Sequence, residues 1–161
     1  MSDITSYMLE QTKKILSIDN PTGFTAHAAE YVLGAYKKLG YDAKLTNKGG
    51  IFVCVNDGPD QADDPADAPI LLEAHMDTLG GMVCSINEKG RLMLSALGGM
   101  NPNNAEAENC KVYTKSGKVY DATFQLENAS VHVNGEYSDT KRTYETMEAI
   151  LDEPVKNKED V

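Results

Sequence analysis

The sequence predicts a mixed α/β layer in the first half of the chain and a β-rich module in the second. Three observations lead to this fold class. Apolar residues recur at helical spacing in the first 40 residues, strand-like runs follow, and tight-turn sequences join the later runs. The chain has 161 residues, 41% of them hydrophobic, which is enough to build one domain of ordinary size or two small ones.

Two helices are predicted at the start of the chain. Ser2 or Asp3 can cap the first, whose rough apolar stripe ends at the turn sequence NPTG, residues 20–23. The second covers residues 26–40 (AHAAEYVLGAYKKLG). Thr25 precedes it as an N-cap, and a glycine stands where helices commonly end.

Three strands are predicted next, at residues 41–45, 51–55 (IFVCV) and 70–74 (ILLEA), and the last two read as buried. Residues 56–69 separate them and hold five aspartates and three prolines. This composition predicts a solvated surface loop. A calcium site is disfavoured because the EF-hand spacing and its closing glutamate are absent.

The β-rich second half begins with two predicted hairpins. Their turns are NEKG at residues 87–90 and KSGK at residues 115–118. Residues 129–133 (ASVHV) predict one more strand. Residues 143–152 fit either a helix or a strand, and residues 155–161 (VKNKEDV) look like the start of a helix.

Charge and cysteine content limit the function classes. The net charge of −10 argues against nucleic acid or an anionic membrane as a partner. No apolar run approaches the roughly 20 residues of a membrane span, and the polar start is unlike a secretory signal. Cys54, Cys84 and Cys110 are odd in number and form no CxxC pair, which indicates reduced thiols in a cytoplasmic protein. Cys54 and Cys84 lie in apolar runs and are expected in the core.

The most informative stretch is residues 70–83, ILLEAHMDTLGGMV. Two polar residues at the end of a buried strand are costly unless they have a use there. If the strand reaches residue 77, His75 and Asp77 point to the same side. Open α/β sheets bind ligands beyond the carboxyl ends of their strands, which is where this pair would lie.

An imidazole beside a carboxylate has two common uses. In a hydrolytic triad the carboxylate orients a general base, but no nucleophile motif such as GxSxG occurs here. In a metal site the carboxylate orients a ligating histidine. The other two histidines are poor candidates, since His27 falls in the first turn of a helix and His132 reads as a half-buried structural residue. From the residues alone, His75 and Asp77 are half of a metal site.

Residues 70–83 strongly resemble the first metal motif of the glutamyl aminopeptidase family, which includes the deblocking and tetrahedral aminopeptidases. Further segments resemble that family in its own order, with Thr22 where the family usually has serine and Ala129 where it has proline. These segments are NPTGFTAHAAEYV, NEKGRLMLSALGGM, ENCKVYTKSGKVYDATF and ENASVHV.

The resemblance implies a cytoplasmic metalloprotease with two divalent metal ions, zinc or cobalt, that hydrolyses N-terminal residues from peptides. It implies His75 as a metal ligand and Asp77 as the catalytic-site carboxylate that orients it. It also implies a homo-oligomer. The implied fold is a partial three-layer α/β/α zinc-peptidase catalytic domain followed by an inserted β-rich, PDZ-like module.

By this resemblance residues 1–80 belong to the catalytic domain, residues 81–152 form the inserted assembly and access domain, and residues 153–161 begin the return. Family members are more than twice as long, and their other metal ligands follow the insert. The chain alone is therefore expected to be inactive, because one histidine cannot hold zinc as protein sites do. The alternative is a non-catalytic module for oligomer assembly or peptide binding.

Overall fold

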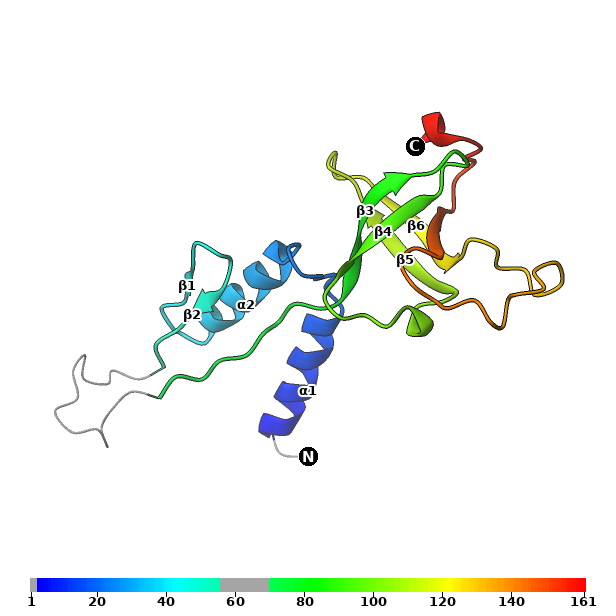
Figure 1. Ribbon diagram of the computed structural model, residues 1–161. Coiled ribbons are helices and arrows are strands. Elements are labelled where there is room, and N and C mark those ends of the chain that lie inside the picture. Colours follow the sequence, from blue (N-terminus) through cyan, green and yellow to red (C-terminus); the bar gives the residue numbers. More distant parts are fainter. Residues whose placement is uncertain (1–2, 56–69) are drawn as a thin grey trace. The chain divides into compact units, whose positions relative to one another are not determined.

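The computed structural model describes residues 3–55 and 70–161 (Figure 1). The chain divides into two compact units, Met1–Thr78 and Leu79–Val161. The predicted acidic loop at residues 56–69 lies outside the described residues. The domain boundaries expected at residues 80 and 152 stay a prediction.

The first unit contains both predicted helices. They are α1, Asp3–Leu16, and α2, Ala26–Lys38. Thr25 is the N-cap of α2, as its sequence predicts, although its side chain makes no capping hydrogen bond. A short antiparallel pair follows, formed by β1, Lys44–Leu45, and β2, Ile51–Phe52.

One strand prediction in this unit is wrong, and another is confirmed only at two residues. Residues 70–74 were expected to form a buried strand, but they belong to no strand, and Ile70 and Leu72 are 88% and 89% exposed. Residues 51–55 pair only at Ile51–Phe52 and are mostly exposed, Cys54 among them. A strand is stable only where a neighbour accepts its backbone hydrogen bonds. Residues 70–74 pair with no strand in the described part of the chain.

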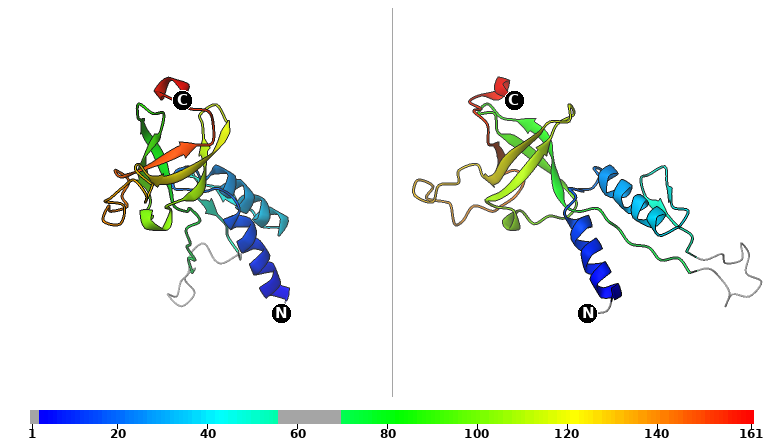
Figure 2. Two further views of the ribbon diagram at one scale, coloured as in Figure 1. Left: turned by 90° about the vertical axis from the view of Figure 1, so that its right-hand side faces the viewer. Right: turned by 180° about the vertical axis from the view of Figure 1, so that it is seen from behind.

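The second unit is a five-stranded antiparallel sheet with strand order β3-β4-β7-β6-β5. Both predicted hairpins are confirmed, and the ambiguous segment 143–152 contains a strand. The sheet is curled (Figures 1 and 2), and β4 and β7 share a single pairing, Leu92 with Ala149. Its strands are β3, Gly80–Ile86; β4, Leu92–Leu97; β5, Glu108–Tyr113; β6, Val119–Leu126; and β7, Met147–Leu151.

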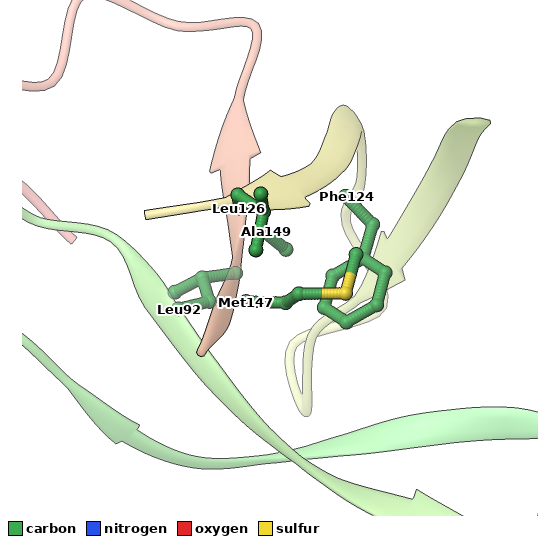
Figure 3. Packing of buried hydrophobic residues seen from close by; sticks show 5 residues of the cluster. All are labelled: Leu92, Phe124, Leu126, Met147 and Ala149. Carbon is green, nitrogen blue, oxygen red and sulfur yellow. The ribbon is translucent and has the colours of Figure 1, made fainter. Parts of the chain in front are cut away.

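The curled sheet encloses a small apolar core (Figure 3). In β6 every second residue near its end is buried, as expected for a strand with one face inward. Full burial of a large apolar side chain contributes about 1.5–3 kcal/mol, so the large members of this cluster stabilise the sheet. The core residues are Leu92, Phe124, Leu126, Met147 and Ala149.

Two further predictions fail in this unit. Cys84 is exposed, because it lies on β3 at one edge of the sheet. The strand expected at residues 129–133 is a series of turns, and His132 is exposed rather than half-buried. The preceding strand β6 already has neighbours on both sides, so it offers no free edge for pairing.

An arginine closes the long connection between β6 and β7. The Arg142 guanidinium donates to both carboxylate oxygens of Glu106, with Nε 2.8 Å and Nη2 3.1 Å away. Its Nη1 donates to the carbonyls of Tyr137 and Thr140. The connection is therefore held by side-chain to backbone hydrogen bonds in place of a strand ladder.

Glu148 is the one charged side chain among the buried residues of the described chain, with 3% of its surface exposed. Asn87 Nδ2 donates to its Oε2 over 3.1 Å, and Asn87 Oδ1 accepts from the backbone N–H groups of Lys89 and Arg91. Burial raises the pKa of the Glu148 carboxyl, and Glu127 adds to the rise. Asn87, Arg91 and Lys89 oppose it.

We expect Glu148→Gln to raise the free energy of unfolding at neutral pH relative to wild type. The folded-state pKa of Glu148 lies above the ordinary glutamate value of about 4.3. At pH values between the ordinary pKa and the folded-state pKa, the folded chain therefore binds more protons than the unfolded chain does. Wild type therefore loses stability as pH rises through the folded pKa, and glutamine does not. The advantage of the variant should shrink as pH falls, as measured by urea unfolding. A stability difference between variant and wild type that does not change with pH would contradict this.

Gly90, in the β3–β4 turn, is needed for close packing. Its φ is +72°, and a Cβ there would lie 2.6 Å from the backbone oxygen of Asn157 and would also clash with Val155. We expect Gly90→Ala to destabilise the chain by about 2 kcal/mol or more. Gly99→Ala is the control, since nothing lies within 4 Å of its added Cβ. Equal unfolding midpoints for the two variants would refute this packing role.

Candidate functional site

The candidate site is built where the turn after α1 meets the segment that follows residue 75. Thr78 N–H donates to the Asn20 carbonyl over 2.8 Å, and Thr22 N–H donates to the Thr78 carbonyl over 3.2 Å. These bonds form a parallel bridge between Pro21 and Thr78. Asn20 is 1% exposed, and its Nδ2 donates to the Met76 carbonyl over 2.6 Å. The two neighbours of Pro21 in the chain, Asn20 and Thr22, therefore hold the backbone of residues 76–78 through hydrogen bonds.

His75 and Asp77 are in direct contact. His75 Nδ1 lies 3.1 Å from Asp77 Oδ1 and 3.2 Å from the Asp77 carbonyl oxygen. The pair points to the same side, as residues two apart do in extended backbone, although the segment is not a strand. The His75 side chain is 86% exposed, which leaves Nε2 open to solvent.

Asp77 also receives a hydrogen bond from Thr22. The Thr22 hydroxyl donates to Asp77 Oδ2 over 2.7 Å. This bond is the largest influence that lowers the pKa of the Asp77 carboxyl, and the His75 contact is the next. An ionised carboxylate at Nδ1 favours the tautomer that carries its proton there and leaves the Nε2 lone pair facing outward. That lone pair can bind a metal ion or accept a proton.

The remaining candidate ligands do not join this pair. Within residues 3–55 and 70–161, no three histidine, cysteine, aspartate or glutamate side chains cluster as a metal site would require. His27 is exposed in the first turn of α2, with its ring 5.9 Å from that of Phe24. The described residues thus fit one metal ligand with its orienting carboxylate, fewer than the three or four protein ligands of zinc sites.

Sequence reasoning missed the contributions of Asn20 and Thr22 to this site. The NPTG segment carried a turn signal only, and Thr22 lies 55 residues from Asp77 along the chain. The polar Asn20 beside a helix end was the available hint. Its Oδ1 is buried and has no hydrogen-bond partner in the described parts of the chain.

Comparisons with known proteins define the class of the chain. Its mixed α/β fold matches that of the tetrahedral aminopeptidases. The profile of the M42 glutamyl aminopeptidase family matches residues 50–161. The chain belongs to this family.

Individual relatives support this membership. YhfE of Bacillus subtilis (strain 168), whose name assigns it to the aminopeptidases, is 36% identical over 94% of this chain and 42% of its own length. The glutamyl aminopeptidase of Lactococcus lactis subsp. cremoris (strain MG1363) is 31% identical over 69% of this chain and 30% of its own. The chain thus spans less than half the length of these relatives.

A solved structure shares the fold. The TET1 peptidase of Pyrococcus horikoshii aligns with a TM-score of 0.75 over 95% of this chain and 42% of its own, with 22% identity. As to membranes, none of the helices in the described residues has the length and apolar character needed to cross a bilayer.

We expect the Asp77 carboxyl to titrate below the ordinary aspartate range, because two hydrogen bonds stabilise its ionised form. A lowered folded-state pKa contributes stability above the ordinary value of about 3.9 and loses it as pH falls through the folded pKa. Carboxyl ¹³C shifts followed against pH report the midpoint directly. A midpoint at or above the ordinary value would show that these hydrogen bonds do not hold in solution.

Proposed function

We propose that the chain is the N-terminal part of a metal-dependent aminopeptidase, a hydrolase that removes N-terminal residues from peptides. The observation that carries the proposal is the His75–Asp77 pair, in which Nδ1 is bonded and Nε2 is open. Membership of the M42 glutamyl aminopeptidase family and the names of the relatives support it.

In this proposal His75 holds one of two divalent metal ions through Nε2, and Asp77 accepts the Nδ1 proton and fixes the ring. Imidazole suits zinc and cobalt alike. When bound, such ions lower the pKa of a water molecule and polarise the scissile carbonyl. The other ligands are assigned to the part of the family's length that this chain does not span.

The proposed function also implies a division of the chain into domains. Residues 1–80 would form part of a three-layer α/β/α catalytic domain, residues 81–152 an inserted PDZ-like module, and residues 153–161 the return to the catalytic domain. The separate compact unit that begins at Leu79 and holds the antiparallel sheet supports this division.

Assembly and location are also proposals. The Pyrococcus horikoshii TET1 peptidase can assemble into a tetrahedron or a large octahedral shell, which supports a homo-oligomer here. Cys84 and Cys110 form no disulfide within the described residues, which is consistent with the reducing cytoplasm.

A second candidate function is a non-catalytic module for oligomer assembly or peptide binding. The observation that favours it is that, among residues 3–55 and 70–161, no three histidine, cysteine, aspartate or glutamate side chains gather as a metal site would require. A chain that acts in this way would not need His75.

We expect the 161-residue chain alone to leave aminoacyl-p-nitroanilides intact in zinc or cobalt, because one imidazole does not hold a metal in a productive site. Joining it to the remaining part of Bacillus subtilis YhfE should give metal-dependent cleavage. His75→Ala should lower that activity at least about 100-fold, since loss of a ligand disables metal catalysis. His27→Ala is the matched control and should retain it.

Size-exclusion chromatography and thermal unfolding identify chimeras that are folded. A folded chimera that is equally active with His75→Ala would contradict the proposed role of His75. Metal-dependent cleavage by the 161-residue chain alone would contradict the claim that it is an incomplete site. A folded chimera with no activity in either metal would favour the non-catalytic module.

A further inference from the structure

A chain of side-chain hydrogen bonds runs from the turn after α1 to the imidazole of His75. Thr22 Oγ1 donates to Asp77 Oδ2 over 2.7 Å, and the other carboxylate oxygen lies 3.1 Å from His75 Nδ1. The Thr22 hydroxyl also lies 3.4 Å from the Thr78 carbonyl. It has one proton to donate, and the shorter bond to a charged acceptor is the stronger one.

Packing does little to orient the His75 ring, because this side chain is 86% exposed. The Asp77 side chain is more covered, with 34% of it exposed. The final torsion of an aspartate side chain is broad, so its carboxylate turns easily unless both oxygens are engaged. Here Thr22 engages one oxygen and His75 the other.

The backbone around the pair is held independently of the Thr22 hydroxyl. The bonds of Thr22 N–H to the Thr78 carbonyl, of Thr78 N–H to the Asn20 carbonyl and of Asn20 Nδ2 to the Met76 carbonyl all remain if the hydroxyl is removed. Thr22 is itself exposed, so valine, which has nearly the same shape, can replace it without disturbing a core.

We propose that Thr22 is a positioning residue for this site. Its hydroxyl locks the Asp77 carboxylate, and the locked carboxylate keeps the His75 proton on Nδ1 with Nε2 presented outward. The inference rests on the proposed function only in the use of His75 as a metal ligand. In proteins, partners of this kind orient metal-binding histidines and affect the function of the site.

The test reads the His75 tautomer in the metal-free 161-residue chain. Imidazole ¹⁵N shifts are recorded at a pH of about 8.5, where ordinary imidazoles are neutral. Wild type should be mainly the Nδ1–H tautomer. Thr22→Val should lower the ratio of Nδ1–H to Nε2–H at least about threefold, because the freed carboxylate no longer holds the proton in place. Thr22→Ser keeps the hydroxyl and should keep the wild-type ratio.

Thr25→Val is the matched control, since the Thr25 side chain makes no capping hydrogen bond in the same region. Equal unfolding midpoints for all four proteins ensure that the ratio reports on the site. A wild-type ratio in folded Thr22→Val would overturn the inference, because the Asp77 carbonyl, 3.2 Å from Nδ1, would then be sufficient. A lowered ratio in Thr22→Ser would also overturn it.

This outcome is distinguishable from failure of the proposed function. The tautomer is measured without metal and without substrate. If the His75→Ala chimera kept its activity, the aminopeptidase role of His75 would fail, while the tautomer ratios would still decide the role of Thr22.

Discussion

The candidate site depends on the parallel bridge between Pro21 and Thr78. Proline has no N–H, so the bridge is made by the N–H groups of Thr22 and Thr78 and by the carbonyls of Thr78 and Asn20. Within the described part of the chain, residues 70–78 make no other strand-type pairing. The bridge therefore brings Thr22 to Asp77, and through Asp77 it sets the environment of His75.

Sequence patterns within a few residues predicted much of the fold. The rest depends on pairing between segments that lie far apart in the sequence. Helix α2 and both hairpins carry their start, turn and end signals within a few residues, so the sequence located them. Residues 70–74 have the composition of a buried strand, but a strand also needs a neighbour, which composition does not report. The environment of Glu148 was hidden for the same reason, since its hydrogen-bond partner Asn87 lies 61 residues away.

The candidate site divides in the same way. The contact of His75 with Asp77 follows from two residues of spacing and could be predicted. The part played by Thr22 could not, because the turn that carries it meets Asp77 only in the folded chain. The first unit also leaves apolar side chains exposed on α1 and at residues 70–72. Under the proposed function, the remainder of a longer family member would cover these surfaces and complete the ligand set.

The measurement that tests the central claim most directly is a cobalt(II) titration of the 161-residue chain, followed by the NMR signals of its three histidine rings. All three are exposed, so access does not separate them. If Asp77 orients His75 as a metal ligand, paramagnetic broadening should reach the His75 ring at a lower cobalt concentration than the rings of His27 and His132. Broadening of all three rings together, or of either other histidine first, would contradict the assignment of His75 and Asp77 as part of a metal site.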